Sequence, residues 1–292
     1  MIQGPQGTLD QENGQADAKP AISRPDGRNE IGRDSGSLII NADDWGRDCI
    51  TTDRILDCAL GMVVSSVSAM VFMEDSHRAA LLAQQHDVDK GLHLNFTTPF
   101  STPQCPSRLV GHLQQCARFL GSHRFAPAIY HPGLTSSFRY VIESQVEEFE
   151  RLYGHSPNRV DGHHHMHLCA NVLLGKLLPA GIVARRNFSF KAGEKGPINR
   201  AYRRWQDGAL MRRHRTSDLF FSLLPLDPRS RLEGIFALAG RYNVEVETHP
   251  ANAEEYRFLM GGELMRSTGE VKVARGYLLR SGAKVCDVEG YS

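Results

Sequence analysis

Strand-like and helix-like segments alternate through most of this chain, and this alternation limits the fold more than any other feature. Short apolar or β-branched runs are separated by stretches whose apolar residues recur at helical spacing. The first strands are expected at residues 38–42, 63–72 and 90–96, with helices at 51–60 and 76–85 between them. A β-α-β-α-β order requires parallel strands joined by right-handed crossovers. Ser76 is the expected N-cap of the second helix.

The alternation continues beyond residues 97–133, a proline-rich stretch that we expect to form an excursion over the top of the fold. Further helices are expected at residues 136–153, 170–178, 200–215, 232–239 and 269–281, and further strands at 159–162, 182–184, 243–248 and 283–288. About seven parallel strands in roughly 250 residues favour a single α/β domain folded as a distorted or incomplete (β/α) barrel. A doubly wound open sheet is the alternative architecture.

The N-terminal segment differs from the rest because it contains almost no large apolar side chains. Such a segment buries too little surface to offset the entropy of ordering. We therefore expect residues 1–36 to be a disordered tail and residues 37–292 to be one domain. The chain starts without the apolar core of a secretory signal, and no apolar run reaches the roughly 20 residues of a membrane-spanning helix.

Charge and cysteine content narrow the partners and the compartment. The net charge of +1 creates no strong field toward nucleic acid or membrane, so we expect no nucleic-acid partner and no stable membrane insertion. The 6 cysteines are scattered without a CxxC pair, which favours reduced thiols and a cytoplasmic location. A homodimer is compatible with this composition.

Acidic and imidazole side chains follow several of the predicted strands. The positions are Asp43 and Asp44 after residues 38–42, His163 after 159–162, His249 after 243–248, and His93 within or near the end of its own strand. In a barrel or an open sheet, the carboxyl ends of parallel strands meet at one rim. Carboxylates and histidines gathered there could hold a divalent metal and activate water. The pattern therefore indicates a hydrolytic enzyme.

Each motif also has a simpler interpretation. The Asp pair is compatible with a turn that caps the next helix, and His93 between leucines is typical of a core histidine. The histidine run at 163–167 could be a solvated tract, and in extended backbone its alternate members would share one side. His249 could be an exposed strand end, while Arg185 and Arg186 are either a solvated pair or the partner of a carboxylate base. The convergence of four strands on one rim favours the metal-site interpretation.

Four motifs together resemble the YdjC-like carbohydrate deacetylases. They are Asn-Ala-Asp-Asp-Trp-Gly (41–46), Gly-Leu-His-Leu (91–94), Asp-Gly-His-His-His-Met-His (161–167) and the Glu-x-x-x-His-Pro ending (245–250). Their order and spacing agree with that family across residues 38–288. The chain departs from the family pattern at Trp45, where Phe is usual, at Gly162, where Ser is usual, and over residues 47–49.

The resemblance implies a distorted (β/α) barrel and a metal-dependent enzyme that removes the N-acetyl group from an acetamido sugar. It implies roles for six residues: metal ligands Asp44, His93 and His163, the base Asp43, the acid His249 and, by a looser match, Arg185 near that base. His164, His165 and His167 stay unassigned between substrate contact and structural support.

The ligand types and the reaction class leave a few alternatives open. An Asp-His-His set suits Zn²⁺ best, with Mg²⁺ or another divalent ion as a weaker match. The N-acetylated sugar could belong to an oligosaccharide, a glycan or a glycolipid. A metal-dependent phosphoester hydrolase would need a second metal and more carboxylates. A non-catalytic sugar- or metal-binding protein would have no need of a base such as Asp43.

Overall fold

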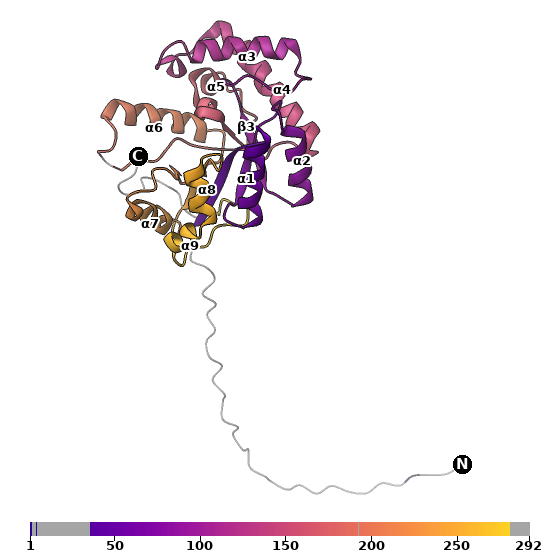
Figure 1. The fold of residues 1–292 in the computed structure, drawn as a ribbon, viewed down its shortest axis with the longest axis vertical. Helices are drawn as coiled ribbons and strands as arrows, with labels where there is room; N and C mark the ends of the chain where they lie inside the picture. Colours follow the sequence, from indigo (N-terminus) through magenta and orange to yellow (C-terminus); the bar gives the residue numbers. More distant parts are fainter. Residues whose placement is uncertain (2–3, 5–35, 192, 281–292) are drawn as a thin grey trace. The chain divides into compact units, whose positions relative to one another are not determined.

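A computed structural model of this chain describes residues 1, 4, 36–191 and 193–280 (Figure 1). The chain divides into residues 1–33 and residues 34–292, and the fold described below belongs to the second part. The predicted disordered tail, apart from Met1, Gly4 and Gly36, lies outside the described residues. The strand predicted at residues 283–288 also lies outside them.

Seven parallel strands form a single sheet in the described part of the chain. They are β1 (Ser37–Trp45), β2 (Ser66–Ala69), β3 (Lys90–Leu94), β4 (Arg159–Gly162), β5 (Val183–Ala184), β6 (Leu219–Ser222) and β7 (Asn243–Thr248). Their spatial order is β5-β4-β3-β2-β1-β7-β6. If the two edge strands, β5 and β6, are placed side by side, the strands follow one another around a circle in chain order from β1 to β7. This is the order of a (β/α) barrel that is open between β5 and β6.

Irregular backbone bonds link the two sides of the opening. Ala184 N donates to Arg215 O over 2.9 Å, and Ser189 N donates to Phe220 O over 2.7 Å. A doubly wound sheet would instead reverse its strand order at a switch point. The predicted distorted (β/α) barrel is therefore confirmed, and the open-sheet alternative is wrong.

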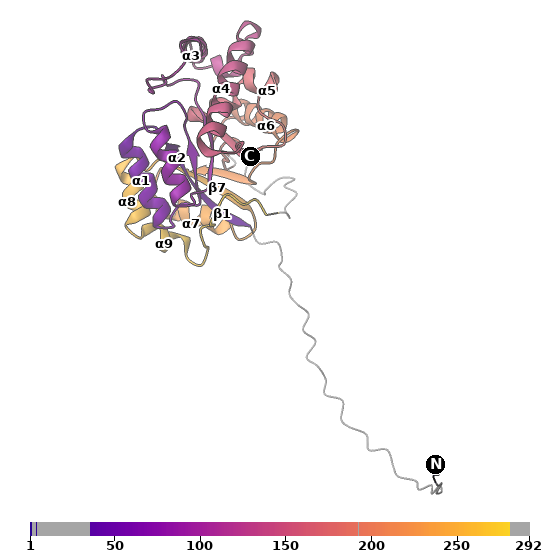
Figure 2. The ribbon, with the colours of Figure 1, turned by 90° about the vertical axis from the view of Figure 1, so that its right-hand side faces the viewer.

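Helices surround these strands, with α1, α2 and α8 gathered on one side and α4, α5 and α6 on another (Figures 1 and 2). The α-helices are α1 (Cys49–Leu60), α2 (Ser76–Gln85), α3 (Ser107–Leu120), α4 (Thr135–Tyr153), α5 (Ala170–Leu174), α6 (Pro197–Met211), α7 (Arg229–Leu238), α8 (Ala253–Met260) and α9 (Glu263–Thr268). Short 3-10 turns are η1 (Ala126–Ala128), η2 (Pro132–Leu134) and η3 (His163–Leu168). None of the described helices is long and apolar enough to cross a membrane.

Several local predictions were wrong for identifiable reasons. Strand β6 and helices α3, α8 and α9 were not predicted, and α3 lies inside the proline-rich excursion. The helix expected at residues 269–281 does not form over its described part, because Val273 bridges Leu38 in a strand-like pairing. Asp75 occupies the N-cap of α2, whereas the Ser76 hydroxyl accepts from Met73 N and donates to Met70 O.

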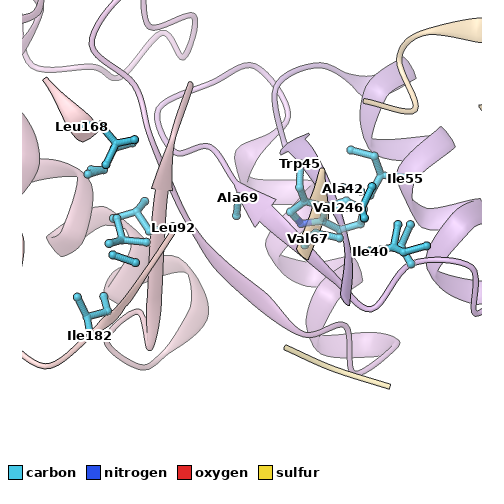
Figure 3. Packing of buried hydrophobic residues seen from close by; sticks show 14 of the residues in the cluster. Ile40, Ala42, Trp45, Ile55, Val67, Ala69, Leu92, Leu168, Ile182 and Val246 are labelled. Atoms are coloured by element: carbon cyan, nitrogen blue, oxygen red, sulfur yellow. The ribbon is translucent and has the colours of Figure 1, made fainter. Parts of the chain in front are cut away.

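The strands divide their side chains between an apolar outer layer and a polar interior. Outward residues such as Ile40, Val67, Leu92 and Val246 belong to the hydrophobic core beneath the helices (Figure 3). The alternate positions on the same strands are mostly polar and buried: Asn41, Asp43, Ser66, Ser68, His93, Asp161, Glu245 and Glu247. Because neighbouring residues of a strand face opposite sides, the barrel interior is lined with polar groups.

Gly91 allows a long side chain to cross the barrel interior. A Cβ at this position would lie 2.7 Å from Arg159 Cγ and Nε. The Arg159 guanidinium donates to Val67 O over 2.7 Å and pairs with Asp89 Oδ1 at 3.1 Å. A side chain at position 91 would therefore collide with Arg159.

We expect Gly91→Ala to lower the free energy of unfolding by about 1–3 kcal/mol, because the added methyl group overpacks the Arg159 side chain. Urea denaturation measures this change. Gly111→Ala is the matched control, since a Cβ there meets open space inside α3 and should stabilise the helix by roughly 0.5–1 kcal/mol. Equal stabilities for the two variants would contradict the close approach.

Candidate metal centre

A left-handed turn at the end of β1 brings two successive carboxylates to the carboxyl rim of the barrel. Asp43 faces the barrel interior, and Asp44 adopts φ 72°. The register between β1 and β2 shifts between Ala42 and Trp45, at the same place. Left-handed backbone is costly for a residue other than glycine and is often found at functional sites. Both residues are buried, with exposed fractions of 2% for Asp43 and 3% for Asp44.

Asp44, His93 and His163 converge on one point. Asp44 Oδ1 lies 3.4 Å from His93 Nε2 and 3.0 Å from His163 Nδ1. The three ligand-type atoms lie within 4.8 Å of one another. Asp44 Oδ1 and His93 Nε2 are both buried and have no hydrogen-bond partner. Unpartnered buried polar atoms are costly, so this Asp/His cluster fits a metal ion that three protein groups could hold.

A second carboxylate orients His93 from behind. Asp161 Oδ1 lies 2.8 Å from His93 Nδ1, which directs Nε2 toward Asp44. The other oxygen, Asp161 Oδ2, accepts a hydrogen bond from the Ser68 hydroxyl at 2.5 Å and forms an ion pair with Arg185 Nη2 at 3.0 Å. A carboxylate behind the imidazole is the usual support of a histidine that binds a metal.

Arg185 is the central cation of the interior. Its Nη1 and Nη2 atoms lie 2.6 and 2.8 Å from the two oxygens of Asp43, which forms a bidentate pair. Its Nε lies 2.7 Å from Glu245 Oε1, and Nη1 lies 3.4 Å from Glu247 Oε2. The side chain is 1% exposed, so the interpretation as a solvated pair is wrong for Arg185.

The buried site contains more negative than positive side chains. Five buried carboxylates line it: Asp43, Asp44, Asp161, Glu245 and Glu247. Four of them contact Arg185, and the fifth pairs with the half-exposed Arg47 at 3.0 Å. Buried charge is stable only when it is paired, so this surplus of carboxylates calls for additional positive charge. A divalent cation beside Asp44 would supply it.

The pKa values follow from this balance. Burial would raise the pKa of Asp43, but Arg185 and His93 outweigh burial and hold it below the usual range. Burial likewise opposes ionisation of Asp44, while His163 and His93 lower its pKa. Burial lowers the pKa of His93, yet Asp161 and Asp43 raise it to about 10. A positive charge at the centre of the carboxylates is therefore strongly favoured.

The histidine run forms a 3-10 turn and not an extended segment. His164 and His165 have φ values of 53° and 57°, so alternate members do not share one side. The His164 ring packs against the His163 ring, with centroids 4.0 Å apart and planes tilted by 32°. His165 Nε2 lies 3.6 Å from Glu247 Oε2. His167 is buried, with Nε2 2.9 Å from Arg185 O, and burial lowers its pKa to about 3. One member of the run, His163, joins the Asp44 cluster.

His249 completes the set of predicted site residues at the end of β7. Its Nε2 lies 4.0 Å from Asp43 Oδ2, and its side chain is 39% exposed. Glu255 fixes the local backbone, because it accepts from His249 N at 2.8 Å and from the Thr248 hydroxyl at 2.7 Å. Burial lowers the pKa of His249, but Asp43 and Glu247 outweigh burial and raise it.

No role was predicted from the sequence for some interior residues. Glu245 and Glu247 alternate with Val244 and Val246 along β7, and serines alternate with apolar residues along β2. Polar residues at every second position of a buried strand are the signal that could have identified them. A second trio of potential ligands, Asp43, His93 and Asp161, is also present, but Arg185 contacts both of its carboxylates.

Fold and site together define an α/β-barrel protein with a buried Asp/His cluster that could bind a metal. The family model described as YdjC-like protein matches residues 37–272. The chain therefore belongs to the YdjC-like family.

Individual relatives match a smaller part of the chain. A carbohydrate deacetylase of Mus musculus is 33% identical over 138 residues, which are 46% of this chain and 44% of that protein. A chitooligosaccharide deacetylase of Yersinia pestis (strain Pestoides F) is 30% identical over 138 residues, 46% of this chain and 52% of that protein. These matches span about half the length of the relatives.

One solved structure supports the fold. It comes from Enterococcus faecalis V583 and is described as a proposed cellobiose-phosphate cleavage protein. It aligns with a TM-score of 0.59 and 18% sequence identity, covering 82% of this chain and 96% of that chain.

We expect His163→Ala to weaken Zn²⁺ binding by more than about 100-fold. This loss is larger than the one typically caused by changing a group that only supports a metal ligand, because His163 would itself be a ligand. Calorimetric titration of metal-stripped protein with zinc chloride measures the affinity. His86→Ala is the control, because His86 is an exposed residue at the end of α2. Unchanged affinity in the His163 variant would remove this residue from the metal centre.

Proposed function

We propose that this protein is a metal-dependent carbohydrate N-deacetylase, a hydrolase that cleaves the amide of an acetamido sugar. The main support is the carboxylate of Asp43, which Arg185 holds in a bidentate pair directly beside the Asp44, His93 and His163 cluster. A base next to a metal centre suits hydrolysis of an unreactive bond. The names of the mouse and Yersinia relatives point to the same reaction.

The proposed metal ligands are Asp44, His93 and His163. Two imidazoles and one carboxylate favour Zn²⁺, while Mg²⁺ or another divalent ion suits this set less well. When bound, the ion would make water more acidic and polarise the acetyl carbonyl. The two unpartnered buried atoms of the cluster are consistent with this role.

Asp43 is the proposed general base. Arg185 keeps it ionised, and Asn41 Nδ2 donates to its Oδ1 at 2.8 Å, so its orientation is fixed from two sides. In the proposed reaction, Asp43 takes a proton from the attacking water, and the hydroxyl group bonds to the acetyl carbon. The C–N bond then breaks, which releases acetate and the amino sugar.

His249 is the proposed general acid for the leaving amine. It faces Asp43 across 4.0 Å and is partly exposed, so a substrate could reach it from the rim. A raised pKa favours the protonated form that can donate to nitrogen. Arg185 takes part as the group that holds Asp43.

A phosphoester hydrolase is less well supported. Such an enzyme typically uses two metals about 3.5–4 Å apart. The second potential trio, Asp43, His93 and Asp161, is neutralised by Arg185, so it offers no second cation site among the described residues. The substrate is therefore proposed to be an N-acetylated sugar. A cytoplasmic location and a homodimer stay predictions.

We expect Asp43→Asn to reduce acetate release from N-acetylated oligosaccharides at least about 100-fold, because the amide cannot take the proton. Zinc content should be unchanged, since Asp43 is not a proposed ligand. Enzymatic acetate detection and elemental analysis measure the two effects, with Asp53→Asn on the surface of α1 as the control. Full activity of the Asp43 variant would show that another group acts as the base.

We expect His249→Gln to slow release of acetate from an N-acetyl sugar by about 100-fold. Hydrolysis of 4-nitrophenyl acetate should fall much less, because its leaving group departs without a proton. The ratio of the two rates therefore tests the acid role separately from binding. An equal loss on both substrates would argue that His249 only shapes the site.

A further inference from the structure

The segment after α9 crosses the amino ends of the barrel strands, opposite the metal centre. Ala274 N donates to Leu38 O over 2.8 Å, at the start of β1. Tyr277 N donates to Asp89 Oδ2 over 2.6 Å, immediately before β3. The segment follows the part of the chain that the family model matches, which ends at residue 272. It therefore contributes contacts that the family motifs do not include.

The Tyr277 side chain enters the barrel interior from this end. Its hydroxyl donates to Glu245 Oε2 at 2.6 Å, and its ring lies beneath the Arg159 guanidinium, whose Cζ is 4.5 Å from the ring centroid. Glu245 is completely buried. Its other oxygen, Oε1, accepts from Arg185 Nε at 2.7 Å. One buried carboxylate thus joins the tyrosine to the central arginine.

These contacts continue through Arg185 to the carboxyl end of the barrel, where the candidate metal centre lies. Arg185 uses Nε for Glu245, which leaves Nη1 and Nη2 for Asp43, while Nη2 also contacts Asp161. The guanidinium is planar and rigid, so the position of Glu245 determines the orientation of the whole fork. Ser217 is the other donor described for Glu245 Oε2, and its hydroxyl lies at a longer 3.4 Å.

We propose that Tyr277 is a positioning residue whose hydroxyl fixes Glu245, so that Arg185 holds Asp43 and Asp161 in place. The effect on Asp43 rests on the proposed deacetylase function. The effect on Asp161, which orients His93, does not rest on it, because zinc affinity can be measured without a substrate.

The kinetic test removes the hydroxyl and keeps the ring. Tyr277→Phe should lower kcat about tenfold, which is the low end of the losses caused by changing a group behind the reacting residues. KM should stay unchanged within about twofold. Tyr256→Phe is the matched control, because that hydroxyl donates to a carboxylate, Asp57 Oδ2, at 2.8 Å on the surface. The control should keep full activity. An unchanged kcat in the Tyr277 variant would overturn the proposal.

A double-mutant cycle tests whether Tyr277 acts through Glu245. Zinc chloride is titrated into the metal-stripped wild type, Tyr277→Phe, Glu245→Gln and the double variant. Each single change should weaken zinc binding by roughly threefold, which is less than the effect of changing a direct partner of a metal ligand. In the Glu245→Gln background, Tyr277→Phe should weaken zinc binding no further. Additive losses would overturn the route through Glu245.

Thermal unfolding of the same four proteins separates positioning from simple folding support. The proposal expects Tyr277→Phe to fold and to lose no more than a few degrees of Tm. Failure of this variant to fold would overturn the proposal, because the hydroxyl would then be needed for the fold itself. If the wild type releases no acetate from any N-acetylated sugar, the proposed function fails, and the zinc cycle still decides the role of Tyr277.

Discussion

The ion pair between Arg185 and Asp43 is the interaction on which the rest of the site depends. One guanidinium contacts Asp43, Asp161, Glu245 and Glu247, and the pair itself is almost completely buried. Removing one partner of a buried pair typically costs about 3–5 kcal/mol, because the other charge is left uncompensated. A lysine could not replace Arg185, since a single ammonium group has no fork to match the two oxygens of Asp43.

The backbone around Arg185 gives a structural role to His167, a histidine that does not face the candidate metal centre. Arg185 follows β5, which has only two residues, so strand pairing alone fixes it weakly. Its N–H donates to Val160 O over 3.1 Å, and its carbonyl lies 2.9 Å from His167 Nε2. His167 remains neutral at ordinary pH because burial lowers its pKa to about 3. It can therefore donate one hydrogen bond to that carbonyl without adding charge to the interior.

Much of the fold could be predicted because the alternation of strands and helices survives in the sequence. Strands 159–162 and 243–248 were predicted with their observed bounds. Strand β6 was missed because Leu-Phe-Phe-Ser is short and aromatic and has no clear alternation. Helix α3 was missed because its stripe of Leu109, Leu113, Cys116 and Leu120 lies in a stretch flanked by prolines.

The predicted site residues do gather at one rim, but their detailed arrangement needs tertiary information. The motifs singled out Asp43, Asp44, His93, His163 and His249, which the barrel brings together. Sequence spacing does not reveal that Arg185 contacts four carboxylates, since these come from β1, β4 and β7. It also could not reveal Tyr277, which contacts Glu245 from the opposite end of the barrel.

Backbone strain at the rim explains how neighbouring residues in the sequence can face the same site. A regular strand would direct Asp43 and Asp44 to opposite sides of the sheet. The left-handed conformation of Asp44 breaks that alternation, at a cost of roughly 1–2 kcal/mol. His164 and His165 also adopt left-handed backbone, after β4. There His163 lies near Asp44, while His165 lies near Glu247. The ion pair with Arg47 and the contact between the His164 and His163 rings offset part of the strain. Without the turn at Asp44, one of the two carboxylates would leave the site, so the proposed base and the proposed metal ligand could not be adjacent residues.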